Sequence, residues 1–483
     1  MAYEKKQAFA VIDEKAPLIR EVADKIWDNP ETAFTEFVSA ETLCVALEGE
    51  GFEVKRGVAG IETAFTGTFG HGKPVIGILG EFDALGGLSQ VAGIDKKEAL
   101  VPGANGHGCG HNLLGAGSLA AAIAVKDYLQ STGREGTVIY FGCPGEEGGS
   151  GKAFMAREGL FDNVDAAVSW HPASYNGTWT VSTLANYQVS YRFYGTSAHA
   201  AGSPHMGRSA LDAVEIMNVG VQFLREHIIQ EARVHYAITN TGGFSPNVVQ
   251  PFAEVLYLIR APKTPQVQHI YERVNKIAEG AAHMTETRLE IDFVKACSNV
   301  VPNKVLNQVM QKNLETMPAL EFDKADYEFA QKIFDSLETP SLDIDGTLAQ
   351  YTKEEDQQVI IDHKDEILHT YIEPLKDIEI CLAGSSDVGD VSWNCPTVQC
   401  MTATEVNGSN AHSWQYVACG KSDMAHKATL YAAKAMAGTA IDLFESPETL
   451  EAAKAELNKR LGGGKYVSPM APEVKPRAIA PKK

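Results

Sequence analysis

The chain has 483 residues, of which 44% are hydrophobic, and it carries a formal net charge of −20. This length exceeds what one ordinary core supports, so we expect two domains or one domain with a large insertion. The acidic balance argues against unassisted binding to nucleic acid or to an anionic membrane surface, and no apolar run is long enough to span a bilayer.

The first part of the chain alternates helical and strand patterns. Helices are predicted over residues 11–27, 37–47, 112–129 and 152–157, with Asn112 as the cap of the third. Short apolar runs predict buried strands over residues 75–79, 137–143 and 166–170. Strands that alternate with helices in this way predict an α/β fold with a mostly parallel sheet and helices on both of its faces.

The pattern changes after residue 186. Strands are predicted over residues 189–193, 234–238, 254–260 and 289–294. Helices are predicted over residues 209–230 and 264–277. The resulting order β-α-β-β-α-β is typical of ferredoxin-like domains, so we place an inserted α+β domain at residues 186–296.

The α/β pattern resumes after this insertion. We expect an acidic helical stretch over residues 302–376, strands over 378–382 and 398–402, and a long helix over 421–444. The main domain then has a first part at residues 1–185 and a second part at 297–445. Residues 446–483 are predicted to form a C-terminal helix and an extended tail rich in Gly, Pro and Lys.

The eight cysteines are scattered without a CxxC pair, and residues 1–15 lack an apolar leader, which favours a reducing cytoplasm. Cys109 stands apart because it lies in the motif Gly-His-Gly-Cys-Gly-His-Asn at residues 106–112. Glycines let the backbone fold tightly, so Cys109 and His111 can converge as a thiolate and an imidazole ligand of one metal. Glycine-rich loops with Cys and His are also common without metal. We predict that His107 in the same motif is an ordinary packed loop histidine.

Two further sets of ligand-type residues follow predicted strands. Glu146 and Glu147 come after the strand at residues 137–143, and His171 ends the strand at 166–170. Open α/β sheets bind ligands at the carboxyl ends of their strands. On an extended backbone, adjacent carboxylates point to opposite sides, so one can bind metal while the other faces a substrate. A surface acidic pair and a lone loop histidine are the ordinary alternatives, but their combination with Cys109 favours a metal site.

Together these motifs resemble the M20 metallopeptidase family, subfamily D, a group of amidohydrolases. The resemblance rests on GHGCGHN (106–112), CPGEEGGSGK (143–152), SWHP (169–172) and TSAHAAGSPHMGRSALDAVE (196–215). Three more stretches resemble the branch that acts on p-aminobenzoyl-glutamate: GGFSPNVVQ (242–250), SSDVGDVSW (385–393) and GSNAHSWQ (408–415). The resemblance extends over nearly the whole chain.

This resemblance implies two divalent metal ions, Zn²⁺ or Mn²⁺, with Cys109 shared between them. The implied ligands are Cys109, His111, Glu147, His171 and His412. It further implies that Glu146 is the general base, which takes a proton from water and later delivers it to the leaving amine. The insertion is implied to be a dimerisation domain, through which His199 reaches the partner's active site and stabilises the oxyanion.

Other residues in the matching stretches have candidate roles. Asn247, Arg208 and His205 are candidate substrate-binding or interface residues, and Asp83 is a candidate to orient a metal ligand. Asp83 begins the sequence Asp-Ala-Leu-Gly, whereas the subfamily usually carries Asp-Ala-Leu-Pro, so the turn here has more backbone freedom. Asp387 and Asp390 also lie in a matching stretch, but neither acquires a role from the sequence.

The expected function is hydrolysis of the amide between an aroyl or acyl group and an amino acid, with p-aminobenzoyl-glutamate as the best single substrate. One alternative is a general N-acyl-amino-acid deacylase or dipeptidase of the same family. Another is a non-catalytic partner subunit of a hydrolase complex, against which the presence of Glu146 argues. We expect a cytoplasmic homodimer, or a heteromer with a related subunit, that binds a small acyl-amino acid and neither nucleic acid nor membrane.

Overall fold

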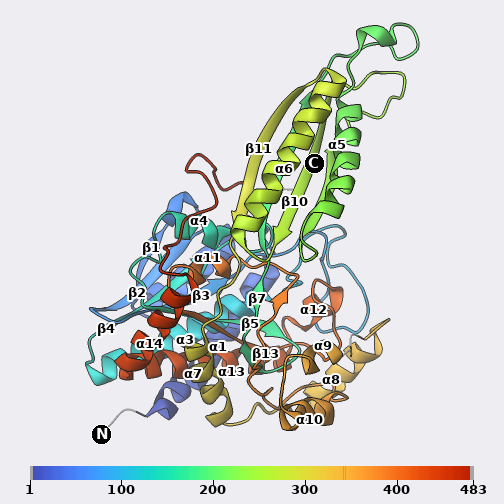
Figure 1. Ribbon diagram of the computed structural model, residues 1–483. Coiled ribbons are helices and arrows are strands. Elements are labelled where there is room, and N and C mark those ends of the chain that lie inside the picture. Colours follow the sequence, from blue (N-terminus) through green and yellow to red (C-terminus); the bar gives the residue numbers. More distant parts are fainter. Residues whose placement is uncertain (1–3, 341, 343, 479–483) are drawn as a thin grey trace.

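A seven-stranded sheet organises the broad body of the molecule in the computed structural model, which describes residues 4–340, 342 and 344–478 (Figure 1). The strand order is β1 (Glu53–Arg56), β2 (Phe65–His71), β4 (Gly136–Cys143), β3 (Val75–Glu81), β5 (Ala166–Ala173), β13 (Thr397–Ala403) and β6 (Gly177–Trp179). Neighbours among β4, β3, β5 and β13 are parallel, whereas β1, β2 and β6 pair antiparallel at the edges. The predicted mostly parallel α/β sheet is confirmed.

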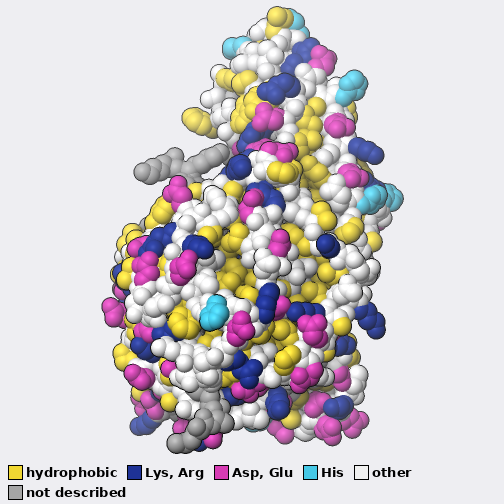
Figure 2. All heavy atoms as spheres, turned by 90° about the vertical axis from the view of Figure 1, so that its left-hand side faces the viewer, with side chains coloured by type: hydrophobic (Ala, Val, Ile, Leu, Met, Phe, Trp, Pro, Cys, Tyr) yellow, Lys and Arg dark blue, Asp and Glu magenta, His cyan; other side chains and the backbone are white. Residues whose placement is uncertain are grey.

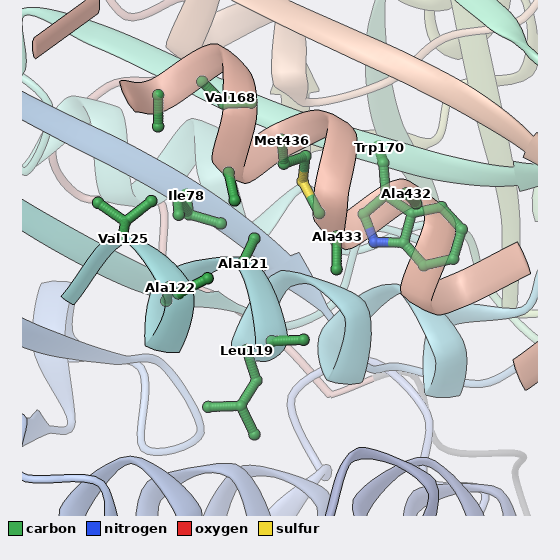
Figure 3. Close-up of a cluster of buried hydrophobic side chains, with 14 of the residues drawn as sticks. Ile78, Leu119, Ala121, Ala122, Val125, Val168, Trp170, Ala432, Ala433 and Met436 are labelled. Carbon is green, nitrogen blue, oxygen red and sulfur yellow. The ribbon is translucent and has the colours of Figure 1, made fainter. Parts of the chain in front are cut away.

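One face of this sheet packs against a layer of helices that includes α1 (Lys5–Asp28), α3 (His111–Thr132) and α13 (Asp423–Glu445). Alternate strand residues such as Ile78 and Trp170 point into this layer, as period-two side-chain direction requires (Figure 3). Both α3 and α13 present alanines at the contact, so the helices approach the sheet and each other closely (Figure 3). These helices confirm the predicted small-residue helix and the predicted long C-terminal helix.

The cap predicted for α3 is wrong. The helix begins at His111, and Gly110 precedes it in the left-handed conformation with φ 72°. The side chain of Asn112 instead donates to the carbonyl oxygens of Ala23 and Gly420, at 3.4 and 2.9 Å. Asn112 therefore ties α3 to neighbouring segments rather than capping its backbone.

The opposite face of the sheet packs against α4 (Gly151–Arg157) and α11 (Val388–Ser392). The remaining α-helices of the body are α2 (Phe37–Gly49), α7 (Lys304–Thr316), α8 (Lys324–Asp335), α9 (Asp345–Leu348), α10 (Glu354–His363), α12 (Trp414–Cys419) and α14 (Pro447–Arg460). The acidic stretch is thus helical in α7 to α10. None of the described helices is both long and apolar enough to cross a membrane.

The strand predicted over residues 378–382 is wrong as part of the central sheet. Only β12 (Cys381–Leu382) forms there, and it pairs with the equally short β7 (Ser182–Thr183) in a separate ribbon. Ile378 is exposed, and a charged residue follows it, so this run cannot fill a position that is buried on both faces.

A second, four-stranded sheet forms a narrow lobe that stands on the body (Figures 1 and 2). Its elements are, in chain order, β8 (Ala185–Tyr194), α5 (Ala210–Leu224), β9 (Arg233–Asn240), β10 (Phe252–Ala261), α6 (Thr264–Thr285) and β11 (Arg288–Cys297). The strand order is β11-β8-β10-β9, with every neighbour antiparallel. Helix α5 ends before the predicted residue 230, because residues 225–227 form a 3₁₀ turn in which Arg225 donates to the Val234 carbonyl oxygen.

The register of these strands defines the two ends of the lobe. Ala185 pairs with Ala261 where the chain enters from the body, and Tyr194 pairs with Phe252 and Arg288 at the far tip. The loops over residues 195–209 and 241–251 therefore both lie at the tip (Figure 1).

Acidic and basic side chains are interspersed over the face of the body and the lobe that Figure 2 shows.

Residues 461–478, here called the C-terminal strap, run from α14 up to the lobe (Figure 1). The Tyr466 hydroxyl donates to Asp390 Oδ1 at 2.8 Å, and the Arg477 guanidinium donates to Asp292 Oδ1 of β11 at 2.7 Å. Arg157 of α4 donates to two carbonyl oxygens of the strap, at 3.0 and 2.7 Å. The strap thus joins the body to the lobe along the outside of the molecule.

Candidate metal and catalytic site

The carboxyl ends of three neighbouring parallel strands meet at one edge of the central sheet. Glu81 ends β3 opposite Cys143, the last residue of β4, and His171 lies near the end of β5. Helix α3 begins beside them at His111. Open α/β sheets place ligand sites at this edge, and the sequence delivers carboxylate, thiol and imidazole groups to it.

A first group of metal-ligand type contains Cys109, His111 and His171, whose candidate ligand atoms all lie within 4.8 Å of one another. Cys109 Sγ is 3.6 Å from His171 Nε2. His111 Nδ1 lies 3.0 Å from Asp83 Oδ1, and His171 Nδ1 lies 2.8 Å from the carbonyl oxygen of Pro172. Because these oxygens accept, both Nδ1 atoms carry the proton in the neutral rings, and both Nε2 lone pairs remain available for a metal.

A second group contains Cys109, Glu147 and His412, also within 4.8 Å of one another. His412 Nε2 lies 2.9 Å from Glu147 Oε1, and the backbone N–H of Glu147 donates to Asp83 Oδ2 at 2.8 Å. His412 has φ 61°, and its backbone N–H donates to the Gly108 carbonyl oxygen at 2.9 Å. A non-glycine residue rarely adopts this left-handed backbone, which here brings a distant segment to the Cys109 loop.

The structure therefore brings together all five side chains predicted as ligands, and Cys109 belongs to both groups. Asp83 contacts one member of each group, as expected for a residue that orients ligands. The His412 side chain is 50% exposed, whereas that of His111 is fully buried, so the site opens to solvent on the His412 side.

Glu146 lies beside these groups, within 4.8 Å of Glu81 and His111. Burial, with the neighbouring carboxylates of Glu81 and Glu147, raises the pKa of Glu146 well above its ordinary value. Glu146 and Glu147 occupy a turn, with the Gly149 N–H donating to the Gly145 carbonyl oxygen at 3.0 Å, so the extended backbone predicted for the pair is wrong. The turn still separates the two carboxylates, and Glu147 alone contacts His412.

The charges at the site fit positive ions. Burial, with the charge of Glu147, raises the pKa of the Cys109 thiol, so a thiolate there requires a compensating cation. Burial alone would raise the pKa of Glu147, but His412 and His111 lower it to about 2. Among the described residues, the buried atoms Glu81 Oε2 and His111 Nε2 lack hydrogen-bond partners. Thiolate, imidazole and carboxylate donors of this kind bind borderline divalent ions such as Zn²⁺.

The residues predicted from the insertion lie elsewhere. His199, His205, Arg208 and Asn247 are all in the two loops at the lobe tip, where the Ala200 N–H donates to the Asn247 carbonyl oxygen at 2.9 Å. No hydrogen bond or ion pair within residues 4–340, 342 and 344–478 connects these four residues to the metal-ligand groups. One chain therefore does not assemble them into a single site.

Two of these tip residues have defined orientations. His199 Nδ1 accepts from the backbone N–H groups of Ala201 and Gly202, at 3.2 and 3.0 Å. In the neutral ring, the exposed Nε2 then carries the proton and is a hydrogen-bond donor. Arg208 donates to Glu286 Oε2 at 2.9 Å, so its guanidinium is engaged at the lobe surface.

His107 is buried next to the site, and its Nε2 lies 3.0 Å from the Ile26 carbonyl oxygen. Burial, with the nearby His111, lowers the pKa of His107 to about 3, so the ring is neutral. It belongs to neither group of ligands, and it packs as an ordinary buried histidine.

Sequence reasoning missed two charged residues of the site and left a third without a role. Lys152 Nζ lies 2.7 Å from Glu81 Oε1 and 2.6 Å from Asp387 Oδ1, and all three side chains are buried. Lys152 stands inside the quoted stretch 143–152, and Glu81 follows the predicted strand, shortly before Asp83. Both residues lie in or beside segments that the sequence singles out, but nothing in the residue pattern indicated that the Lys152 side chain points into the protein.

Known proteins resemble this chain in sequence and in fold. The chain is 50% identical over 460 residues to one of the subunits of p-aminobenzoyl-glutamate hydrolase from Escherichia coli, covering 95% of this chain and 96% of that protein. The structure of an aminobenzoyl-glutamate utilization protein from Klebsiella pneumoniae superposes with a TM-score of 0.56 at 16% identity, covering 86% and 96% of the two chains. A dinuclear metal binding peptidase of the M20 family from Bacillus subtilis gives 0.53 at 17% identity, covering 90% and 99%.

These two structures share the fold. The model of Peptidase family M20/M25/M40 matches residues 95–437, which contain all five predicted ligands and Glu146. The chain therefore belongs to peptidase family M20/M25/M40 and is a hydrolase of amide bonds that uses divalent metal ions.

Proposed function

We propose that this hydrolase cleaves p-aminobenzoyl-glutamate to p-aminobenzoate and glutamate with two bound Zn²⁺ or Mn²⁺ ions. The observation that carries the proposal is the partly buried Glu146 carboxylate beside the two groups of candidate ligands that share Cys109. The 50% identical relative from Escherichia coli is named for this substrate, and the Bacillus subtilis neighbour is described as dinuclear.

Cys109, His111 and His171 would hold one ion, and Cys109, Glu147 and His412 the other. When bound, such ions polarise a carbonyl group and make water more acidic. Glu146 takes a proton from the attacking water on its carboxylate and gives it to the amide nitrogen as that nitrogen leaves. The partial burial of Glu146 limits the access of bulk water and strengthens these interactions.

We further propose that the active unit is a dimer in which His199 serves the partner's site. His199 lies at the lobe tip with Nε2 as an exposed donor, which is the group that an oxyanion requires. The lobe also presents an unpaired edge strand, β9, with Tyr236 and Ile238 42% and 41% exposed. On α5 of the same lobe, Phe223 is 73% exposed. A second copy covering this edge would bury apolar surface and complete the sheet.

The substrate assignment is tested by purifying the chain alone and measuring hydrolysis of p-aminobenzoyl-glutamate with added Mn²⁺ or Zn²⁺. Several N-acyl-amino acids and dipeptides serve as comparison substrates. We expect the highest kcat/KM on p-aminobenzoyl-glutamate. A higher value on an acyl-amino acid or dipeptide would replace the assignment by a general deacylase or dipeptidase, and activity that appears only with a related second subunit would indicate a heteromer.

The role of His199 is tested by mixing two inactive variants, His199→Ala and Glu146→Gln. In a dimer that exchanges subunits freely, about half of the dimers contain one of each variant, and one of their two sites then has both intact residues. We expect the mixture to recover about a quarter of wild-type activity by this count. A mixture as inactive as its components would show that His199 does not act across an interface.

A further inference from the structure

Glu81, Lys152 and Asp387 form a buried chain of charges that leads into the metal site. Lys152 lies between the two carboxylates, 2.7 Å from Glu81 Oε1 and 2.6 Å from Asp387 Oδ1. The backbone N–H of Lys152 also donates to Asp387 Oδ2 at 2.8 Å. Two contacts from Asp387 therefore fix the lysine, and the lysine in turn fixes one oxygen of Glu81.

The other oxygen of Glu81 points at His111. Glu81 Oε2 is buried, has no hydrogen-bond partner within the described part of the chain, and lies 3.3 Å from His111 Nε2. With its Nδ1 proton directed to Asp83, a neutral His111 presents a lone pair at Nε2. Two buried acceptor atoms that face each other at this distance need a shared proton or a cation between them, and a bound metal ion supplies the cation.

The distance of 3.3 Å also suits two ligands of one ion. Nitrogen and oxygen ligands lie about 2.0–2.1 Å from Zn²⁺, so two such ligands are about 2.8–3.0 Å apart in an octahedral arrangement and about 3.3–3.4 Å apart in a tetrahedral one. The same reasoning with a zinc–sulfur distance of about 2.3 Å gives about 3.6 Å for a thiolate and an imidazole. Cys109 Sγ and His171 Nε2 are separated by 3.6 Å. This distance equals the one expected for a thiolate and an imidazole that bind the same zinc ion.

We propose that Glu81 is a sixth protein ligand of the metal site, on the ion held by His111, and that Lys152 and Asp387 are positioning residues that aim its carboxylate. This inference rests on the proposed two-metal function. A carboxylate ligand beside the imidazole of His111 makes that position harder and more negative. It therefore favours Mn²⁺ relative to Zn²⁺ at that position, because carboxylate oxygen suits harder ions.

The test compares the wild type with Glu81→Gln and Asp387→Asn. Both variants remove one charged partner of Lys152, but only Glu81→Gln changes a group that faces His111. Each protein is stripped with chelator and titrated with Mn²⁺, Zn²⁺ and Co²⁺ at one pH, by calorimetry, by elemental analysis and by the visible spectrum of Co²⁺. We expect Glu81→Gln to weaken one of two Mn²⁺ sites by about 10-fold or more and to alter the Co²⁺ spectrum.

For Zn²⁺ the loss in Glu81→Gln should be smaller than for Mn²⁺. Asp387→Asn should change the Co²⁺ spectrum less than Glu81→Gln does, since Asp387 acts on the ion only through Lys152 and Glu81. Equal changes in both variants, or no change in Glu81→Gln, would overturn the assignment of Glu81 as a ligand. A wild type that binds no metal would instead refute the proposed function.

A structure of the Mn²⁺-loaded wild-type protein gives an answer without any variant. We expect a Glu81 oxygen at about 2.0–2.3 Å from the ion on His111. A Glu81 carboxylate that contacts only Lys152 and protein groups in that structure would refute the proposal, even where a variant does not fold.

Discussion

Glu146→Gln is the sharpest single change for separating chemistry from architecture. The amide keeps the size of the side chain but cannot accept a proton from water. General-base assistance contributes typically 10²–10⁴-fold, so kcat should fall by about that factor, which corresponds to about 2.7–5.4 kcal/mol. The metal content should not change, because both groups of ligands remain intact.

The same change should stabilise the metal-free protein. Glu146 is buried near Glu81, Glu147 and Asp387, and burial together with their repulsion raises its pKa. Replacing one member of such a cluster by a neutral amide removes that repulsion. We expect a free energy of unfolding higher by about 0.5–2 kcal/mol, the usual range where an active site trades stability for function.

The assay combines steady-state hydrolysis of p-aminobenzoyl-glutamate, elemental analysis of the loaded protein and urea unfolding after chelation. Glu36→Gln is a matched control, since burial and the charge of Asp83 raise the pKa of that carboxyl to about 8, but it lies outside the ligand groups. A Glu146→Gln variant that keeps more than about a tenth of wild-type kcat with full metal content would refute the general-base role. Loss of metal from it would show that Glu146 is a ligand.

Three other predictions test different parts of the structure. Cys109→Ala should lose both ions in elemental analysis, because Cys109 belongs to both groups; retention of one ion would contradict the sharing. Burial raises the pKa of Asp390 from 3.8 to about 6. The neutral form therefore contributes stability that is complete below about pH 4 and is lost as the pH rises through about 6. Relative to Asp390→Asn, the wild type should lose about 3 kcal/mol in urea unfolding between these limits, and parallel pH profiles would disprove this. Gly117→Ala places a Cβ 2.9 Å from the buried Trp170 ring and should lower the free energy of unfolding by about 1–3 kcal/mol. Gly280 has open space around it, so Gly280→Ala should raise the free energy of unfolding by up to about 1 kcal/mol through helix stability. Equal unfolding midpoints for these two glycine variants would contradict the packing of α3 on β5.

The sequence predicted those elements whose side chains repeat a simple pattern. β3, β4 and β5 are continuous apolar runs, as strands buried on both faces must be, and the alternating strands of the lobe were equally readable. β1 and β2 escaped prediction because they lie at the sheet edge, where β1 is mostly charged and β2 has glycines in place of apolar alternation. β2 pairs with β4, and β1 pairs with β2, and no local pattern records these contacts.

The gathering of the five candidate ligands was predictable because their residue types are unusual at strand ends and match a family pattern, and the structure brings all five together. The contact of Lys152 with Glu81 and Asp387 was not predictable, because the three residues are far apart in sequence and a lysine ordinarily points to solvent. The position of His199 shows a different limit. Its loop is at the lobe tip, away from the candidate ligands, so no contact within a single chain tests its predicted role.

The C-terminal strap places the last described residues on a different part of the molecule from the first described helix. The first described helix, α1, packs in the layer beneath the central sheet, while Arg477 is tied to Asp292 on the lobe (Figure 1). Fluorescent dyes attached near residues 5 and 477 would therefore report any swing of the lobe relative to the body as a change in energy transfer. For the same reason, an affinity tag that must not disturb such motion belongs at the amino terminus.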